Sequence, residues 1–106
     1  KLCSGDHPTI AALLTDLGVV YKDLGKAKEG LKYLQQAIAM QRRLYRGNHS
    51  NIATSLAIIG FSYKDLGDTK KGLDYLHKSL DMLRKLHTDN HPAIAELLNS
   101  IGFAYK

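Results

Sequence analysis

Three histidines at a constant interval are the residues whose spacing first suggests chemistry. His7, His49 and His91 are separated by 42 residues each. Metal ligands must converge on one point, at about 2 Å from the ion. Equivalent positions of successive repeats lie about two helix diameters apart, roughly 20 Å, so these imidazoles cannot share an ion. We therefore predict no metal ligands and interpret each histidine as a structural residue at the start of a helix.

Covalent catalysis would need a nucleophile, a base and an orienting acid within mutual hydrogen-bond reach. Cys3 and His7 are close in sequence, but Cys3 lies in a terminal segment with no surrounding residues to form a shielded pocket. The glycines are isolated, so no phosphate-binding loop is present, and no calcium-binding loop occurs. The sequence predicts no catalytic residues, no cofactor and no enzymatic activity.

The constant interval extends beyond the histidines and identifies an internal repeat. Residues 7–48 and 49–90 share 19 identities over 42 aligned positions, far more than chance would give. The recurring positions include Leu14, Leu56 and Leu98; Gly18, Gly60 and Gly102; and Tyr21, Tyr63 and Tyr105. This register divides the chain into a tail (1–6), two complete units (7–48 and 49–90) and a first half-unit (91–106).

Each unit is predicted to form two helices. Apolar residues at intervals of three and four mark one face of a first helix over about residues 8–24, namely Ile10, Leu14, Leu17, Tyr21 and Leu24. A second helix over about residues 26–45 has the predicted buried stripe Leu31, Leu34, Ile38 and Leu44. The last half-unit supplies only a first helix, over about 92–106.

Glycines and acidic residues mark the expected helix ends. Gly25 suits the left-handed conformation that ends many helices, and Asp6 and Asp68 are candidate N-caps. Gly18 and its counterparts lie inside helices, where a glycine costs about 1 kcal/mol relative to alanine. Their recurrence therefore indicates close approach of a neighbouring helix. The recurring tyrosines are expected to pack in the core with their hydroxyl groups at the surface.

Composition and charge limit the classes of partner that the chain is expected to bind. Hydrophobic residues make up 44% and charged residues 24%, which is typical of a folded chain. The net charge of +5 favours acidic partners modestly, but no run of five basic residues indicates nucleic acid. No apolar run reaches the roughly 20 residues that a membrane span needs. With a single cysteine, an intracellular, cytoplasmic location is expected.

These motifs resemble the tetratricopeptide repeat, in the 42-residue form found in kinesin light chains and related scaffolds. The first-helix signature matches Leu14, Leu17-Gly18 and Tyr21, and again Leu56, Ile59-Gly60 and Tyr63. The second-helix signature of small, bulky and small residues matches Gly30, Leu34 and Ala37. The resemblance implies an all-α, right-handed superhelical stack of antiparallel helix pairs, an α-solenoid of about two and a half repeats.

The resemblance also implies a concave groove lined by the first helices. Its predicted stripes are Ala12, Thr15, Val19 and Lys22; Thr54, Ala57, Phe61 and Lys64; and Glu96, Asn99, Phe103 and Lys106. We expect binding through Lys22, Lys64, Lys106, Phe61, Phe103 and Asn99. Phenylalanines beside lysines would suit a peptide with a hydrophobic anchor and acidic flanks. In the alternative interpretation, the phenylalanines pack between helices and the lysines are solvated.

The expected function is a non-enzymatic module that binds a protein or peptide, as part of a larger scaffold or adaptor. A structural spacer or self-association element, and a kinesin-light-chain-like cargo adaptor segment, are the alternatives. Lys1-Leu2 aligns with Arg43-Leu44, at the end of a second helix, and the sequence stops inside a unit. We expect the outer face of the final half-unit to be exposed and to promote end-to-end association or helix swapping.

Overall fold

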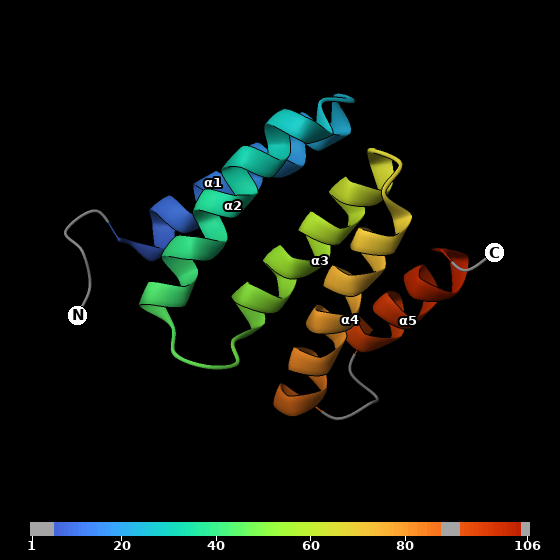
Figure 1. The fold of residues 1–106 in the computed structure, drawn as a ribbon. Helices are drawn as coiled ribbons and strands as arrows, with labels where there is room; N and C mark the ends of the chain where they lie inside the picture. Colours follow the sequence, from blue (N-terminus) through green and yellow to red (C-terminus); the bar gives the residue numbers. More distant parts are fainter. Residues whose placement is uncertain (1–5, 88–91, 105–106) are drawn as a thin grey trace.

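In the part of the chain that the structure describes, five helices form two antiparallel pairs and a single final helix (Figure 1). The computed structural model describes residues 6–87 and 92–104. The helices are α1 (Pro8–Asp23), α2 (Ala27–Leu44), α3 (Ser50–Asp65), α4 (Thr69–Leu86) and α5 (Pro92–Ala104). Helix α3 packs on both α2 and α4, and α5 packs on α4. The predicted all-α stack of helix pairs, about two and a half repeats long, is confirmed.

Histidines cap the first helix of each complete unit. The Nδ1 atom of His7 accepts a hydrogen bond from the Thr9 amide at 3.1 Å, and that of His49 accepts one from Asn51 at 3.0 Å. The structural interpretation of these two histidines is confirmed, whereas His91 lies outside the described residues. The prediction of Asp6 as the cap was wrong.

The Asp6 carboxylate instead binds the end of α2. It accepts two hydrogen bonds from the Arg43 guanidinium, at 2.7 and 2.9 Å, which is the bidentate geometry that makes such pairs strong. The second predicted cap is confirmed, because Asp68 accepts a hydrogen bond from the Lys71 amide at 3.1 Å. Gly25 has a φ of 80°, as expected for the residue that turns the chain from α1 into α2.

Helices within a pair touch through glycines. A Cβ atom on Gly60 would lie 2.8 Å from the Gly72 carbonyl oxygen, and one on Gly72 would lie 2.7 Å from the Gly60 oxygen. Gly18 and Gly30 make the same reciprocal contact in the first pair. The expected close approach is therefore confirmed for both complete units. Gly102, at the equivalent position of α5, has no atom within 4 Å of such a Cβ.

The apolar core lies between successive pairs. One cluster joins α2 to α3 through Leu34, Ile38, Ile52, Leu56 and Ile59. The other joins α3 and α4 to α5 through Ala53, Leu76, Leu80, Leu83, Ile94, Leu97 and Ile101. Stacked tyrosines flank the pairs, with ring centroids 5.3 Å apart for Tyr21 and Tyr33 and 5.5 Å for Tyr63 and Tyr75.

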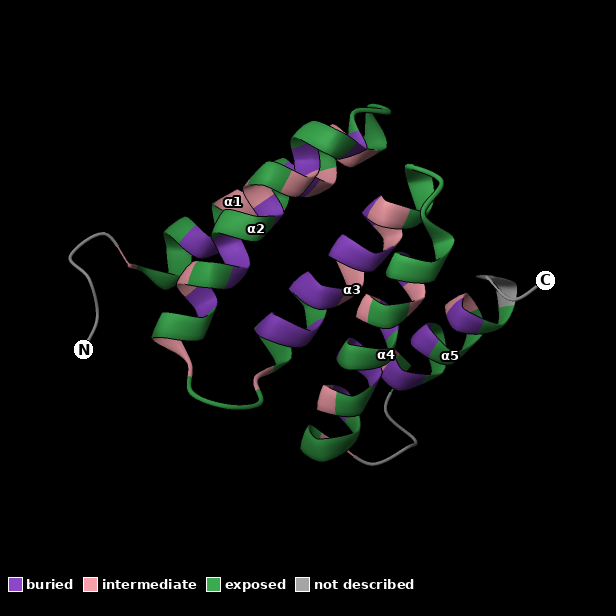
Figure 2. Ribbon diagram, viewed as in Figure 1, coloured by how far each residue is buried: buried purple, intermediate pink, exposed green. Residues whose placement is uncertain are grey.

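Burial is uneven along the stack (Figure 2). Seven residues of α3 are buried, whereas α1 buries only Ala11 and Gly18. The predicted apolar face of α1 exists, but Ile10, Leu17 and Leu24 are exposed to solvent. The reason is positional: α3 has a neighbour on each side, while α1 packs chiefly on α2.

The glycine contact predicts opposite effects of one substitution at two equivalent positions. Gly60→Ala should lower the free energy of unfolding by about 1–3 kcal/mol, because the new methyl group meets the α4 backbone. Gly102→Ala should be neutral or raise it by up to about 1 kcal/mol, because alanine is the better helix former where space is open. Urea denaturation followed by circular dichroism measures both, and equal effects would contradict the contact.

Candidate binding groove

Three of the four predicted groove residues of α3 line a cavity between α3 and α5, which we call the α3–α5 cavity, and Lys64 is not part of its lining. Its volume is about 510 Å³. Thr54, Ala57 and Phe61 line it from α3, and Ala93, Glu96 and Leu97 form the α5 wall. Ser50, Ala53, Ile58, Ser79, Leu83, His87 and Ser100 complete the lining. The cavity can accommodate one or two side chains of a peptide, but it lacks the enclosure of a small-molecule site.

The floor of this cavity is apolar. Phe61 and Ala57 are half-buried and pack against the core cluster that joins α4 to α5. Asn99 is exposed on α5 and is not part of the lining. The Phe103 side chain and the whole of Lys106 lie outside the described residues. Of the four groove residues predicted on the last helix, the structure therefore describes the side chains of Glu96 and Asn99 alone.

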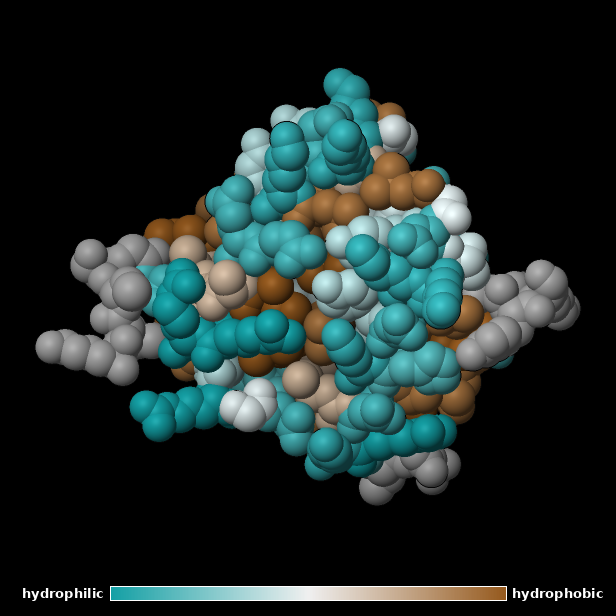
Figure 3. Space-filling model, in the orientation of Figure 1, coloured by the Kyte–Doolittle hydropathy of each residue, from teal (hydrophilic) through white to brown (hydrophobic). Residues whose placement is uncertain are grey.

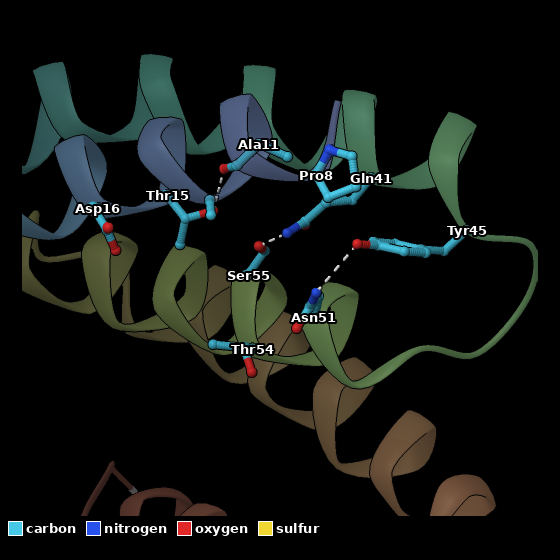
Figure 4. Close-up of a pocket in the computed structure, with 10 residues that line it drawn as sticks. Pro8, Ala11, Thr15, Asp16, Gln41, Tyr45, Asn51, Thr54 and Ser55 are labelled. Carbon is cyan, nitrogen blue, oxygen red and sulfur yellow. Dashed lines mark hydrogen bonds between the residues drawn. The ribbon is translucent and has the colours of Figure 1, made fainter. Parts of the chain in front are cut away.

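A second, smaller cavity lies between α1 and α3, and we call it the α1–α3 cavity (Figure 4). Its volume is about 140 Å³. The lining is largely polar and comprises Pro8, Ala11, Ala12, Thr15 and Asp16 of α1, Gln41 and Tyr45 at the end of α2, and Asn51, Thr54 and Ser55 of α3. Two of the predicted groove residues of α1, Ala12 and Thr15, therefore face this cavity, while Val19 and Lys22 do not line it.

Gln41 is a buried polar residue of the α1–α3 cavity, with 4% of its surface exposed. Its side-chain amide accepts a hydrogen bond of 2.7 Å from the Ser55 hydroxyl, which is itself fully buried. Among the described residues, no buried side-chain polar atom lacks a partner. The second polar atom of the Gln41 amide is therefore not fully enclosed, and the exposed Asp16 lines the same cavity at a distance from Gln41, beyond Thr15 (Figure 4).

The predicted groove lysines Lys22 and Lys64 differ in whether they form an ion pair. The Lys22 ammonium lies 3.1 Å from the Asp65 carboxylate, so it joins α1 to α3. Lys64 is exposed and forms no ion pair with the part of the chain that the structure describes. Asp65 follows Lys64 directly, so each repeat carries one basic and one acidic residue at this edge.

Several groove residues were missed from the sequence. Asp16 and Ile58 occupy one position of successive repeats, just outside the stripe that the resemblance implied. Gln41 of α2 and Tyr45, the residue that caps this helix, also line a cavity, whereas the predicted groove comprised residues of the first helices alone. A glutamine interrupting the apolar stripe of α2 was the available signal, because a buried amide needs a partner from a neighbouring helix.

The described residues contain neither a cluster of metal-ligating side chains nor a membrane-spanning helix. No group of three or more histidine, cysteine, aspartate or glutamate side chains there is arranged to hold a metal ion. None of the helices, within the described residues, has the length and apolar character needed to cross a membrane.

Stacked helix pairs whose first helices line a cavity define a helical-repeat protein of the α-solenoid class. Family comparison agrees, since a tetratricopeptide repeat profile matches residues 9–70 and a second one matches residues 52–93. The chain belongs to the tetratricopeptide repeat family. Repeats of this family are generally non-catalytic modules of protein–protein interaction. No curated protein shows significant sequence similarity to the chain.

The buried Gln41–Ser55 pair predicts a double-mutant signature. Gln41→Leu should cost about 1–3 kcal/mol of stability, because it leaves the buried Ser55 hydroxyl without its partner. Adding Ser55→Ala should recover most of that loss. Urea denaturation of both single variants and the double variant measures the coupling.

Asn51→Ala is the matched control for this pair. Its side chain donates only a long, exposed hydrogen bond of 3.4 Å to the Tyr45 hydroxyl, so stability should change by less than about 0.5 kcal/mol. Additive losses in the Gln41 and Ser55 variants would show that the two groups do not depend on each other.

Proposed function

We propose that this chain binds an extended peptide segment of a partner protein and holds an apolar side chain of that segment in the α3–α5 cavity. The observation that carries the proposal is the apolar lining of a cavity of about 510 Å³, with Phe61 and Ala57 in its floor and Leu97 in the α5 wall. An exposed hollow of this size with an apolar floor gains from burying a large aliphatic or aromatic side chain.

The charges around the cavity favour one orientation of the bound peptide. Lys64 lies one helical turn beyond Phe61 on the same stripe of α3, and its charge favours an acidic residue at that end. Glu96 lies on the opposite wall and disfavours a carboxylate there. The net charge of +5 supports attraction of an acidic segment over a longer range.

The α1–α3 cavity complements this arrangement with hydrogen-bonding groups. Asn51, the Gln41 amide and the Asp16 carboxylate are positioned to bind polar atoms of a segment that continues from the apolar anchor. An extended segment requires such partners, because its backbone groups lose water when it enters a groove.

Rigid positioning of the groove lowers the cost of binding. The Lys22–Asp65 ion pair and the buried Gln41–Ser55 hydrogen bond both connect the first repeat to α3. Side chains that are already ordered lose little conformational entropy when a partner arrives. The same contacts would serve a structural spacer, which is the competing function and which predicts no ligand in the groove.

A kinesin-light-chain-like cargo adaptor is the narrower form of this proposal. The 42-residue unit and the histidine N-caps at His7 and His49 support it. The absence of enzymatic activity and a cytoplasmic location are parts of the same proposal and stay predictions.

Filling the cavity should abolish binding without unfolding the chain. Peptides would be selected from a random peptide library on the unmodified protein, and their affinities measured by fluorescence polarisation. Ala57→Phe places a ring in the cavity and should weaken the selected peptides by at least about 10-fold, as expected for loss of an anchor pocket. Ala39→Phe, at an exposed position of α2, is the control and should leave affinity unchanged.

The charge component has its own matched pair. Lys64→Glu should weaken acidic peptides by about 5- to 20-fold at low salt, and Lys70→Glu, which makes the same charge change at an exposed position of α4, should have little effect. Selected peptides without an apolar residue, or equal loss in the two charge variants, would contradict the proposal. Failure to select any peptide would favour the spacer.

A further inference from the structure

Helix α1 presents an apolar stripe to solvent whose equivalents in α3 are buried. Ile10 and Leu17 are 44% and 43% exposed, whereas Ile52 and Ile59, at the same repeat positions, are 2% and 0% exposed. Helix α2 covers this face of α3. The stripe of α1 consists of Ile10, Leu13, Leu17, Val20 and Leu24, all of them exposed. A continuous patch of this kind on a helix marks an interaction surface.

The residue type at position 13 shows whether the stripe of α1 would pack as α3 packs on α2 or as α5 packs on α4. The equivalent residue of α3 is Ser55, which pairs with Gln41 of α2. The equivalent residue of α5 is Leu97, which lies in an apolar cluster with Leu83 of α4, and Leu83 is itself the equivalent of Gln41. Leu13 is therefore suited to an apolar partner of the Leu83 type and not to a buried glutamine.

The similarity between α1 and α5 holds along the whole contact. Helix α5 buries Ile94, Leu97 and Ile101 against the α4 cluster. Helix α1 has Ile10, Leu13 and Leu17 at the equivalent positions. The stripe of α1 also continues into Val20 and Leu24. Helix α1 is paired with α2, just as α3, which packs on α2, is paired with α4.

We propose that α1 of a second copy of this chain docks on α4 in place of α5. The α1–α2 pair of the incoming copy then sits on α4 as the α3–α4 pair sits on α2. The contact joins two different surfaces, so it is heterologous and adds copies head to tail, into a ring or an open chain. The stripe on α1 is separate from the proposed peptide groove, whereas its docking site on α4 adjoins the groove at Leu83; the proposal assigns a second copy as the occupant of the stripe.

Sedimentation velocity of the unmodified chain, from about 10 µM to about 1 mM, covers the weak affinities expected when α5 competes for the same surface. The weight-average sedimentation coefficient should rise continuously past that of a dimer. Leu13→Gln with Leu17→Gln should lower the association constant by at least about 10-fold, because both side chains lie at the centre of the stripe. Both are exposed, so circular dichroism should show an unchanged fold.

Two further variants separate this contact from its alternatives. Leu66→Gln with Leu98→Gln removes two other exposed leucines and should leave association unchanged. Leu97→Gln should weaken the hold of α5 on α4 and increase association, and adding the Leu13 and Leu17 changes should cancel that increase. A discrete dimer, insensitivity to the Leu13 and Leu17 changes, or loss of association in the Leu66 and Leu98 variant would overturn the proposal, as would a monomer at the highest concentration.

Discussion

The structure depends on one constraint: a helix pair of this repeat has more apolar surface than its two helices can cover for each other. Burying a leucine or isoleucine side chain stabilises a fold by about 1.5–3 kcal/mol, and the first helix of each unit carries several on the face that points away from its own partner. That face is covered only when the second helix of a neighbouring unit packs on it. Stability in such arrays therefore comes from contacts between adjacent repeats. Figure 3 shows the result at the surface, where hydrophobic atoms emerge in the centre of this view among hydrophilic side chains.

Within this constraint, the interfaces between repeats are not identical. The α2–α3 interface contains the buried Gln41–Ser55 hydrogen bond, and the α4–α5 interface has Leu83 and Leu97 at the same positions. A glutamine opposite Leu97 would lose its partner, and a leucine opposite Ser55 would strand the hydroxyl group. One exchanged pair of side chains thus gives each interface a preferred register and partner, although the backbones of the repeats are alike.

The repeat made most of the fold predictable from sequence. The glycines at positions 18 and 60 indicated close helix contacts, and the structure places Gly30 and Gly72 against them. The role of Asp6 was not predictable in this way. Its carboxylate binds Arg43 near the end of α2, and only the packing of the folded chain brings these two residues together. Contacts within a unit follow from local periodicity, whereas contacts between units depend on how the units are placed.

The binding groove was predicted only in part, for the same reason. The α3 stripe through Ala57 and Phe61 does line a cavity, because its position follows from the helical period alone. The pairing of Lys22 with Asp65 could not be read from either residue, since it depends on the rotation of α1 relative to α3. Gln41 reaches the α1–α3 cavity only because α2 ends beside α3.

The proposed groove and the proposed self-association share a structural element, and this links them energetically. Helix α5 forms one wall of the α3–α5 cavity, through Ala93, Glu96 and Leu97. If α1 of a second copy replaces α5, the equivalent wall residues are Thr9, Ala12, Leu13 and Asp16, the last in place of Ser100. The residues of α3 are kept, but the carboxylate of the wall moves by about one helical turn, from the position of Glu96 to that of Ser100. A peptide whose acidic residue lies against the Glu96 position would bind the associated form more tightly and, by reciprocity, promote association, whereas one whose acidic residue lies against the Ser100 position would do the opposite.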